Sequence, residues 1–254
     1  MGARAVVQGL WVGKSLSTLE QLSLSSFLYH GHDYHLYVYE DIQVPRGVVL
    51  QDANEILSRT QVFKDRVLDS FANFSDIFRY KLLLERGGYW ADADTICLRP
   101  FDFPQEYVFA MERTQEGTDE STKYGPALVC GGVIKAPPGS AIMRMLYEAS
   151  LEKASGPYEW WELGPPMINE AVSKFGLAQF VVPAKTFVPI NWWDWEDILS
   201  DRLSTRLKLR WNLMPGVYAV HLWNSMWTRA HASKDASYPA KCLYERLKGR
   251  YLTV

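Results

Sequence analysis

The sequence of 254 residues has few cysteines, no long apolar run and almost no net charge, and each absence excludes a class of protein. Cys97, Cys130 and Cys242 are odd in number and far apart, which fits neither a disulfide framework nor a metal knuckle. No uninterrupted apolar run approaches the roughly 18 residues of a membrane span, and the first residues lack a signal-peptide pattern. The formal net charge of -2 gives no reason to expect non-specific binding to nucleic acid. We therefore expect a cytoplasmic protein.

Length and composition predict one globular domain over residues 1–254. Hydrophobic residues make up 48% of the chain and charged residues 22%, which is ordinary for a globular protein that buries one sizeable core.

The first third of the chain predicts an α/β fold with a mostly parallel central sheet flanked by helices. A β-rich run at residues 6–11 precedes a capping-box pattern at Ser17 and Glu20, which predicts a helix that stops near Gly31. A second β-rich run follows at residues 35–39. Strand, helix and strand in this order form a βαβ unit with parallel strands. The loop after the first strand is then expected at the carboxyl edge of the sheet, where ligands bind in such folds.

Two closely spaced acids follow the next predicted elements. We expect a helix from Ser75, a plausible N-cap, to about Arg86, a glycine break at 87–88, and a short strand that ends in Asp92 and Asp94. Acids at i and i+2 on a regular strand point to the same face and repel each other unless a cation lies between them or water screens them. A hard divalent cation held by carboxylates and substrate phosphates is the usual chemical use of such a pair.

The predicted helix also carries Asp76 and Arg79 on one face. They are either a surface ion pair on a capped helix or part of a site. Beyond the acidic segment, the patterns predict a polar loop at 112–123, a buried strand at 127–134, a helix from about 141, a helix opened by Pro at 164–166, and a strand at 218–227 that runs into a polar aromatic cluster.

Ten tryptophans are unusual at this length, and several lie in segments rich in Pro, Gly and acids. Trp160, Trp161 and residues 192–195 are examples. Flat aromatic faces suit the apolar face of a sugar ring, although indoles also simply fill cores and hydrogen-bond locally.

The arrangement of these residues resembles the core motif of Asp-x-Asp sugar transferases, broadly glycosyltransferase family 32 and its relatives. These include α-1,4-galactosyltransferases, initiating α-1,6-mannosyltransferases and the glucosylating domains of clostridial toxins. The resemblance rests on four segments in the same order: Gln8-Gly9-Leu10-Trp11-Val12-Gly13; Ser75-Asp76-x-x-Arg79-Tyr80 with Gly87-Gly88-x-x-Ala91-Asp92-x-Asp94 and Leu98-x-Pro100; Trp161-Glu162-Leu163-Gly164-Pro165; and His221-x-Trp223-Asn224.

This resemblance implies a GT-A fold that binds a nucleotide sugar and a divalent metal and transfers the sugar with retention, making an α-linkage. By position, it implies the following roles: metal ligands Asp92, Asp94, His221 and Asn224; donor-binding residues Leu10, Trp11, Asp76, Arg79, Tyr80, Asp92, Asn224 and Trp227; and catalytic residues Asp76, Arg79, Asp92 and Asp94. The resemblance of residues 11–13 to UDP-using members favours UDP over GDP.

One position departs from the toxin pattern, because Leu222 stands where an acidic ligand is expected. Either His221 or Asn224 compensates, or water fills the coordination position. Imidazole is tolerated better by Mn²⁺ than by Mg²⁺, so Mn²⁺ is the favoured ion. His221 also has the simpler interpretation of a hydrogen-bonded core histidine.

The acceptor is expected to be a glycan or a lipid-linked glycan, and Trp192, Trp193 and Asp194 are candidates for its binding wall on composition alone. The basic stretches at 202–210 and 241–250 have leucines interleaved, and they either dock on the inner face of an anionic membrane or form solvated helix faces. Two other functions stay open: a nucleotide-sugar hydrolase with the same metal site, and a catalytically silent carbohydrate-binding domain.

Overall fold

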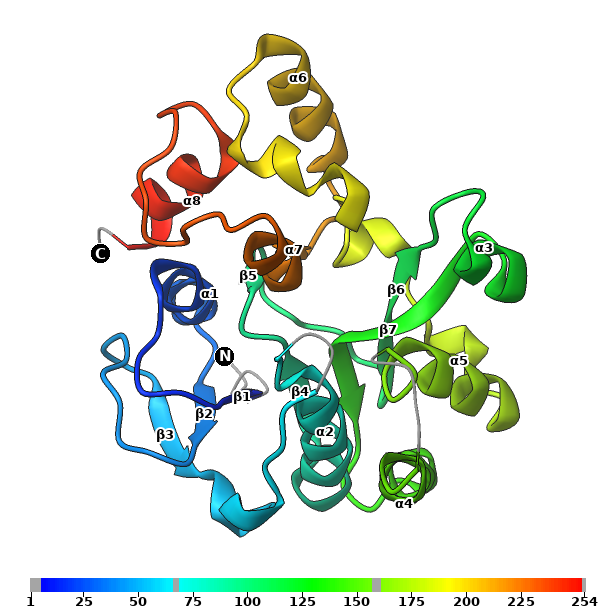
Figure 1. Ribbon diagram of the computed structural model, residues 1–254. Coiled ribbons are helices and arrows are strands. Elements are labelled where there is room, and N and C mark those ends of the chain that lie inside the picture. The colour runs from blue at the N-terminus through cyan, green and yellow to red at the C-terminus, as the bar shows by residue number, and fades with distance from the viewer. Residues whose placement is uncertain (1–5, 66–68, 157–160, 253–254) are drawn as a thin grey trace.

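The computed structural model describes residues 6–65, 69–156 and 161–252, and its centre is a six-stranded sheet in the order β3-β2-β1-β4-β7-β6 (Figure 1). The strands are β1 Val7–Trp11, β2 Tyr34–Val38, β3 Val49–Asp52, β4 Gly88–Ala91, β6 Val108–Arg113 and β7 Ala127–Ala136. β1 runs parallel to both β2 and β4, and β2 runs parallel to β3, whereas β7 is antiparallel to β4 and β6. The predicted α/β fold with a mostly parallel sheet is confirmed.

Helices cover both faces of this sheet. They are α1 Thr18–Tyr29, α2 Ala72–Arg86, α3 Asp119–Tyr124, α4 Ala141–Ala154, α5 Pro165–Lys174, α6 Leu203–Asn212, α7 Asn224–Arg229 and α8 Leu243–Tyr251. On one face, α2, α4 and α5 share a hydrophobic cluster with side chains such as Leu10 and Trp90. On the other face, α1 and α8 share a cluster with the alternate strand residues, such as Val7 and Tyr89. This alternation along each strand is the period-two pattern that places successive side chains on opposite faces.

A smaller two-stranded sheet joins distant parts of the chain. β5 (Thr95–Cys97) follows the acidic segment and pairs antiparallel with β8 (Ala219–His221) near the C-terminus. The pairing places Thr95 opposite His221.

Local sequence signals locate several element ends correctly. Ser17 caps α1 in a capping box with Glu20, as predicted. Gly87 ends α2 at a φ of 64°, in the left-handed region that glycine adopts without a Cβ penalty. The helices that start after Ser140 and at Pro165 also begin where the sequence predicts.

Three predicted elements need correction. α2 begins at Ala72, before Ser75, because Asn73 and Phe74 are buried and tertiary packing extends the helix. The segment 112–123 is not one loop, since it contains the end of β6 and most of α3. The strand predicted at 218–227 ends at His221, because Trp223 takes a left-handed conformation with a φ of 58° and starts α7.

None of the described helices combines the length and the apolar character that crossing a lipid bilayer requires.

Candidate active site

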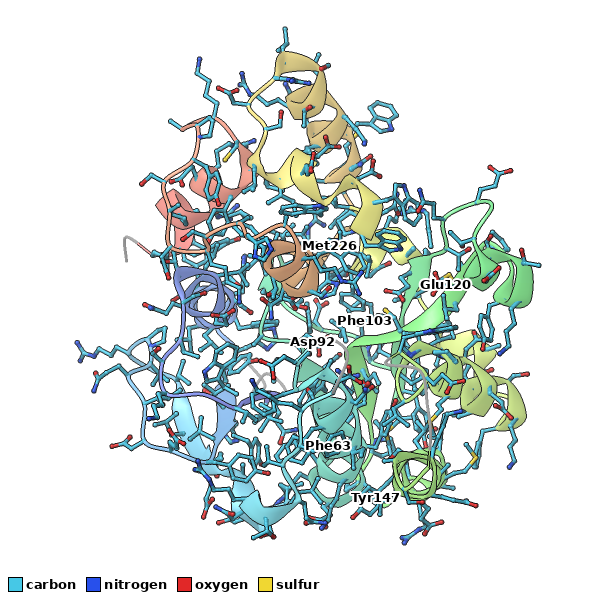
Figure 2. The ribbon with its side chains drawn as sticks, in the orientation of Figure 1. Phe63, Asp92, Phe103, Glu120, Tyr147 and Met226 are labelled. Carbon is cyan, nitrogen blue, oxygen red and sulfur yellow. The ribbon has the colours of Figure 1, made fainter. Side chains whose placement is uncertain are left out.

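The two acids of the Asp-x-Asp segment lie in the turn between β4 and β5 rather than on a strand. β4 ends at Ala91, and the amide of Thr95 donates to the carbonyl of Asp92 to close the turn. Since β4 and β1 are parallel neighbours, this turn lies at the same sheet edge as the end of β1, as expected for ligand sites in such folds (Figure 2).

The C-terminal segment reaches Asp94 from the far end of the chain. The Nε2 atom of His221 lies 3.0 Å from Oδ1 of Asp94, and the backbone amide of Asn224 donates to Oδ2 of Asp94 at 2.7 Å. The left-handed backbone of Trp223 makes the sharp turn between these two contacts. A non-glycine residue in this region is strained, and such strain is commonly found at functional sites.

Electrostatics couple Asp94 and His221 tightly. Burial lowers the pKa of His221, but the neighbouring Asp94 carboxylate outweighs burial and raises this pKa to about 9. Burial acts to raise the pKa of Asp94, and the imidazolium of His221 with the Asn224 amide holds it below its usual value. In the metal-free protein at neutral pH, the two side chains therefore form an ion pair.

The donor set around Asp94 fits a divalent cation. Asp92, Asp94 and His221 each offer one ligand atom, and these atoms all lie within 4.8 Å of one another. The side-chain oxygen Oδ1 of Asn224 is buried and has no hydrogen-bond partner among the described residues. Buried polar atoms are normally satisfied, so this carbonyl oxygen is a further candidate ligand. Two carboxylates and one imidazole are ligands that suit Mn²⁺.

A buried ion-pair network adjoins this group. Arg79 donates from Nη1 to Asp76 at 2.6 Å and from Nη2 to Asp92 at 2.7 Å. Asp92 also accepts from the indole of Trp90, whose ring lies 5.0 Å from the Arg79 guanidinium carbon. Arg79 is only 5% exposed, so the alternative of a surface ion pair on α2 is wrong.

Asp76 has a raised pKa, and Arg79 has a buried nitrogen without a hydrogen-bond partner in the described part of the chain. Burial raises the pKa of Asp76 to about 6, although Arg79 acts in the opposite direction. The Nε of Arg79 is buried without a partner among the described residues. The network therefore retains a donor, Nε of Arg79, that a polar ligand can satisfy.

Two glycines, Gly131 and Gly164, make room for these charged side chains, and a third lies beside them. A Cβ on Gly131 would collide with the Arg79 guanidinium, and one on Gly164 would lie 3.1 Å from Oδ2 of Asp76. Gly132 lies beside Asp92, where a Cβ would meet Oδ2 at an ordinary 3.8 Å. The glycine pair on β7 and the Gly-Pro start of α5 are thus both parts of the site wall.

The other predicted donor residues divide into two groups. Leu10 and Trp11 lie at the end of β1, and Trp11 is partly exposed, with its indole donating to the Ser15 carbonyl. Tyr80 and Trp227 are fully buried, and their polar atoms donate to the carbonyls of Leu163 and Leu222. The polar atoms of Tyr80 and Trp227 are therefore already hydrogen-bonded inside the protein.

The tryptophan-rich segment forms a 3₁₀ helix, Trp192–Leu199, whose Trp195 ring packs against Trp227 of α7. The rings of Trp192 and Trp193 are partly exposed and perpendicular, with centroids 5.4 Å apart. Asp194 accepts from Lys208 at 2.8 Å. Trp161 packs its ring edge against Tyr124, whereas Trp160 lies outside the described residues.

Sequence reasoning missed Glu112, which it assigned to a polar loop. Glu112 is the penultimate residue of β6 and lies opposite Leu128. It is two residues beyond Ala110, which packs on the same face of the sheet as Cys130 and the α1 cluster. Burial raises its pKa to about 7, with His221 acting against this and Glu120 and Asp92 adding to it. The available signal was that Glu112 directly follows the apolar run of residues 108–111.

Two family models match this chain in consecutive segments. Residues 18–110 match the glycosyltransferase sugar-binding region containing DXD motif. Residues 151–251 match the alpha 1,4-glycosyltransferase conserved region. The first segment contains the Asp92-x-Asp94 triplet and the second contains His221 and Asn224. Fold, site and family models together define an enzyme that transfers sugars. More particularly, it is a glycosyltransferase of the Asp-x-Asp type, as its resemblance predicted, and the DXD region implies binding of a divalent metal and a nucleotide-sugar donor.

Several solved structures are similar to this chain at low sequence identity. The PaToxG glycosyltransferase is 12% identical with a TM-score of 0.48, over 97% of this chain and 87% of that chain. The WbbM bifunctional glycosyltransferase, in its apo structure, is 12% identical with a TM-score of 0.44, over 98% of this chain and 52% of that chain. A transferase mutant is 10% identical with a TM-score of 0.41, over 77% of this chain and 90% of that chain. No curated protein matches the chain in sequence.

Proposed function

We propose that this glycosyltransferase is metal-dependent, takes a UDP-sugar and transfers the sugar with retention, forming an α-linkage to a hydroxyl of a glycan or glycolipid. The observation that carries the proposal is the convergence of Asp92, Asp94 and His221, with the Asp76–Arg79 network directly beside them. Mn²⁺ is the proposed ion, because an imidazole takes part.

The residues divide the chemical work. Asp92, Asp94 and His221 hold the cation, with Asn224 as a fourth candidate ligand. When bound, the cation neutralises the negative charge that develops on the leaving diphosphate.

Asp76 and Arg79 are proposed to orient the donor sugar, with the unsatisfied Nε of Arg79 as one available donor. Their rigidity supports this role, since Arg79 is held by two carboxylates and the Trp90 ring. Correct positioning of reactants can lower a barrier by about 7–11 kcal/mol. Trp11 is proposed to stack on the base. No residue is assigned as a nucleophile. The acceptor hydroxyl is therefore proposed to attack the anomeric carbon on the face from which the diphosphate leaves, and the leaving phosphate oxygen takes the hydroxyl proton.

Thermal unfolding with UDP and GDP, each with and without Mn²⁺, tests the donor site. A ligand at about 100 times its dissociation constant stabilises the folded protein by roughly 2.7 kcal/mol, a shift of several degrees in Tm. We expect a Mn²⁺-dependent shift with UDP that disappears in Asp94→Asn. Asp102→Asn removes an exposed acid outside the site and is the matched control.

Product analysis then separates the remaining alternatives. Incubation with UDP-sugars and glycan acceptors is expected to give an elongated glycan with an α-linkage. Free sugar in place of a glycan product would favour the hydrolase. Glycan binding without any effect of nucleotide or Mn²⁺ would favour the silent binding domain.

A further inference from the structure

Helix α6 presents an apolar stripe to the outside of the molecule. Leu203, Leu207 and Trp211 follow a spacing of four residues, which places them on one side of the helix, and Met214 follows just beyond its C-terminal end. They are 67%, 56%, 75% and 47% exposed, respectively, and none belongs to either hydrophobic cluster. In Figure 1 this helix lies at the upper periphery of the molecule, away from the central sheet.

The opposite side of α6 fixes the helix to the protein. Leu209 is 3% exposed and belongs to the core cluster, and Leu213 packs against the same cluster. Lys208 bonds Asp194 and Asp197 of the neighbouring 3₁₀ turn at 2.8 and 2.7 Å. The outward stripe is therefore held in place and is not the product of a loosely attached helix. An exposed apolar row of this kind commonly marks an interaction surface.

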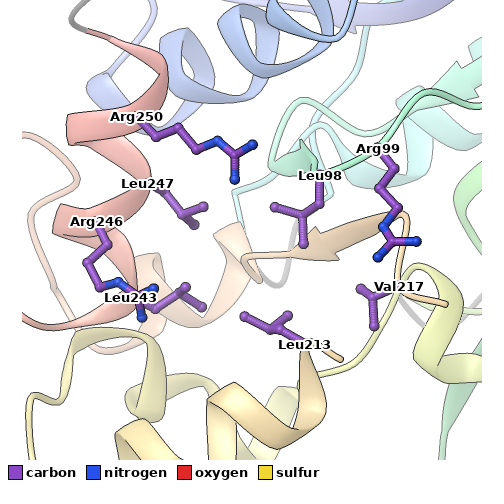
Figure 3. A pocket seen from close by; sticks show the side chains of 8 residues that line it. All are labelled: Leu98, Arg99, Leu213, Val217, Leu243, Arg246, Leu247 and Arg250. Carbon is purple, nitrogen blue, oxygen red and sulfur yellow. The ribbon is translucent and has the colours of Figure 1, made fainter. Parts of the chain in front are cut away.

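A pocket of about 330 Å³ lies beside the C-terminal end of α6, between it and α8 (Figure 3). Its apolar lining comes from both helices and from the segments after β5 and before β8: Leu98, Leu213, Val217, Leu243 and Leu247. Three exposed arginines surround this lining: Arg99, Arg246 and Arg250.

In the part of the chain that the structure describes, the arginines around this pocket lack carboxylate partners, whereas Lys208 and Lys248 have them. Among the described residues, no salt bridge involves Arg99, Arg246 or Arg250, and Arg210 on α6 is likewise unpaired. The nearby acids are occupied instead by lysines, as in the Lys248–Glu245 pair. Guanidinium groups bind phosphate oxygens through paired N–H donors, so the pocket suits a phosphate with an apolar neighbour.

We infer that the α6–α8 face docks on an anionic phospholipid membrane. The outward stripe of α6 enters the interface between headgroups and acyl chains, and the arginine-lined pocket receives a lipid phosphate. Trp and Leu on one helix face with arginines close by are typical of helices that lie in a membrane interface. A two-fold contact between copies through this face is disfavoured, because it would bring the unpaired arginines of one copy against those of the other. The inference stands apart from the proposed donor and metal. The glycolipid acceptor that it favours rests on the proposed function.

Vesicle co-sedimentation of the full chain tests the apolar stripe. Vesicles of phosphatidylcholine that contain about 30% phosphatidylserine are compared at low salt with vesicles of phosphatidylcholine alone. We expect binding to the anionic vesicles, reduced about tenfold or more in the double variant Leu207→Ser/Trp211→Ser. The matched control is Leu151→Ser/Phe175→Ser, because these side chains are also exposed apolar residues but lie on α4 and directly after α5.

A second pair of variants tests the arginines. Each basic residue near an anionic surface strengthens binding about fivefold, so Arg246→Gln/Arg250→Gln is expected to weaken partitioning about 30-fold. Arg144→Gln/Lys174→Gln, with the same charge change on α4 and α5, is expected to bind like the wild type. Thermal unfolding of every variant verifies that the fold is intact.

The outcomes separate this inference from the proposed function. Absence of binding to anionic vesicles, or equal loss in test and control variants, overturns the inference. A wild-type dimer in analytical ultracentrifugation that Leu207→Ser/Trp211→Ser converts to a monomer also overturns it, in favour of self-association. The Mn²⁺-dependent UDP shift is measured without vesicles, so its failure would leave membrane docking unaffected.

Discussion

Alanine at Gly131 should displace the arginine at the centre of the site. A Cβ at this position would lie 2.8 Å from Cζ of Arg79 and closer still to Nη1. The φ of Gly131 is outside the left-handed region, so the alanine backbone is unstrained and the effect is purely steric. Arg79 must move, and its bonds to Asp76 and Asp92 must lengthen.

The structure bounds the size of this effect. Overpacking a buried position costs about 1–3 kcal/mol, and complete loss of a buried ion pair costs about 3–5 kcal/mol. Because the guanidinium can shift and keep one of its two carboxylates, we expect Gly131→Ala to lower the free energy of unfolding by about 1–3 kcal/mol. The same change at Gly132 adds a Cβ at ordinary contact distance from Asp92, so we expect a loss below about 0.5 kcal/mol.

Urea unfolding at pH 7, followed by a transfer assay, measures both consequences. Gly131→Ala should reduce the transfer rate about tenfold or more, because Arg79 holds Asp92 and is proposed to orient the donor. In an Arg79→Met background the added cost of Gly131→Ala should largely disappear, since the flexible side chain can yield. Equal unfolding midpoints and equal transfer rates for the two glycine variants would refute this account of the site wall.

Three further predictions follow from individual contacts. The affinity for Mn²⁺ should rise about tenfold per pH unit from pH 7 toward pH 9, because the ion must displace the proton of His221, whose pKa Asp94 raises to about 9. Titration calorimetry of His221→Gln should show a flatter dependence of this affinity on pH. An unchanged dependence would contradict the assignment of His221 as a ligand. The metal-free Glu112→Gln variant should gain stability relative to the wild type as pH rises from 5 to 8. The pKa of Glu112 is raised from 4.5 to about 7 in the folded protein, so this carboxyl ionises at lower pH in the unfolded chain and destabilises the folded state over that range. Urea unfolding at pH 5 and pH 8 measures the difference, and an equal difference at both pH values would argue against a raised pKa. Ser17→Ala should lower the free energy of unfolding by about 1 kcal/mol, since it removes the capping box of α1, and a thermal midpoint equal to that of the wild type would show that the cap contributes nothing.

The sequence predicted the parts of the fold that depend on neighbouring residues. The capping box at Ser17 and the glycine at position 87 act within one turn of chain, so their consequences are visible without tertiary information. The start of α2 was placed too late, because burial of Phe74 against the sheet outweighs the local N-cap preference of Ser75.

The site was predictable to the level of its residue types and not of its contacts. Asp92 and Arg79 were each singled out, but their ion pair depends on how α2 packs against β4. The glycine pair on β7 gave no sign that it leaves space for a guanidinium, since this requires β7 to lie beside α2. Glu112 was missed for the same reason, because its neighbours at the site come from other strands and from the C-terminal segment.

The pairing of β5 with β8 has a consequence for how the protein is made. Asp94 and Asn224 are 130 positions apart, so the ribosome delivers the acidic half of the metal site long before the imidazole half. A chain interrupted before β8 carries the Asp-x-Asp triplet without His221 and without the strand that holds it in place. The proposed cation site is therefore completed only after β8 has been made, so a chain that stops before β8 is expected to lack Mn²⁺-dependent binding of nucleotide.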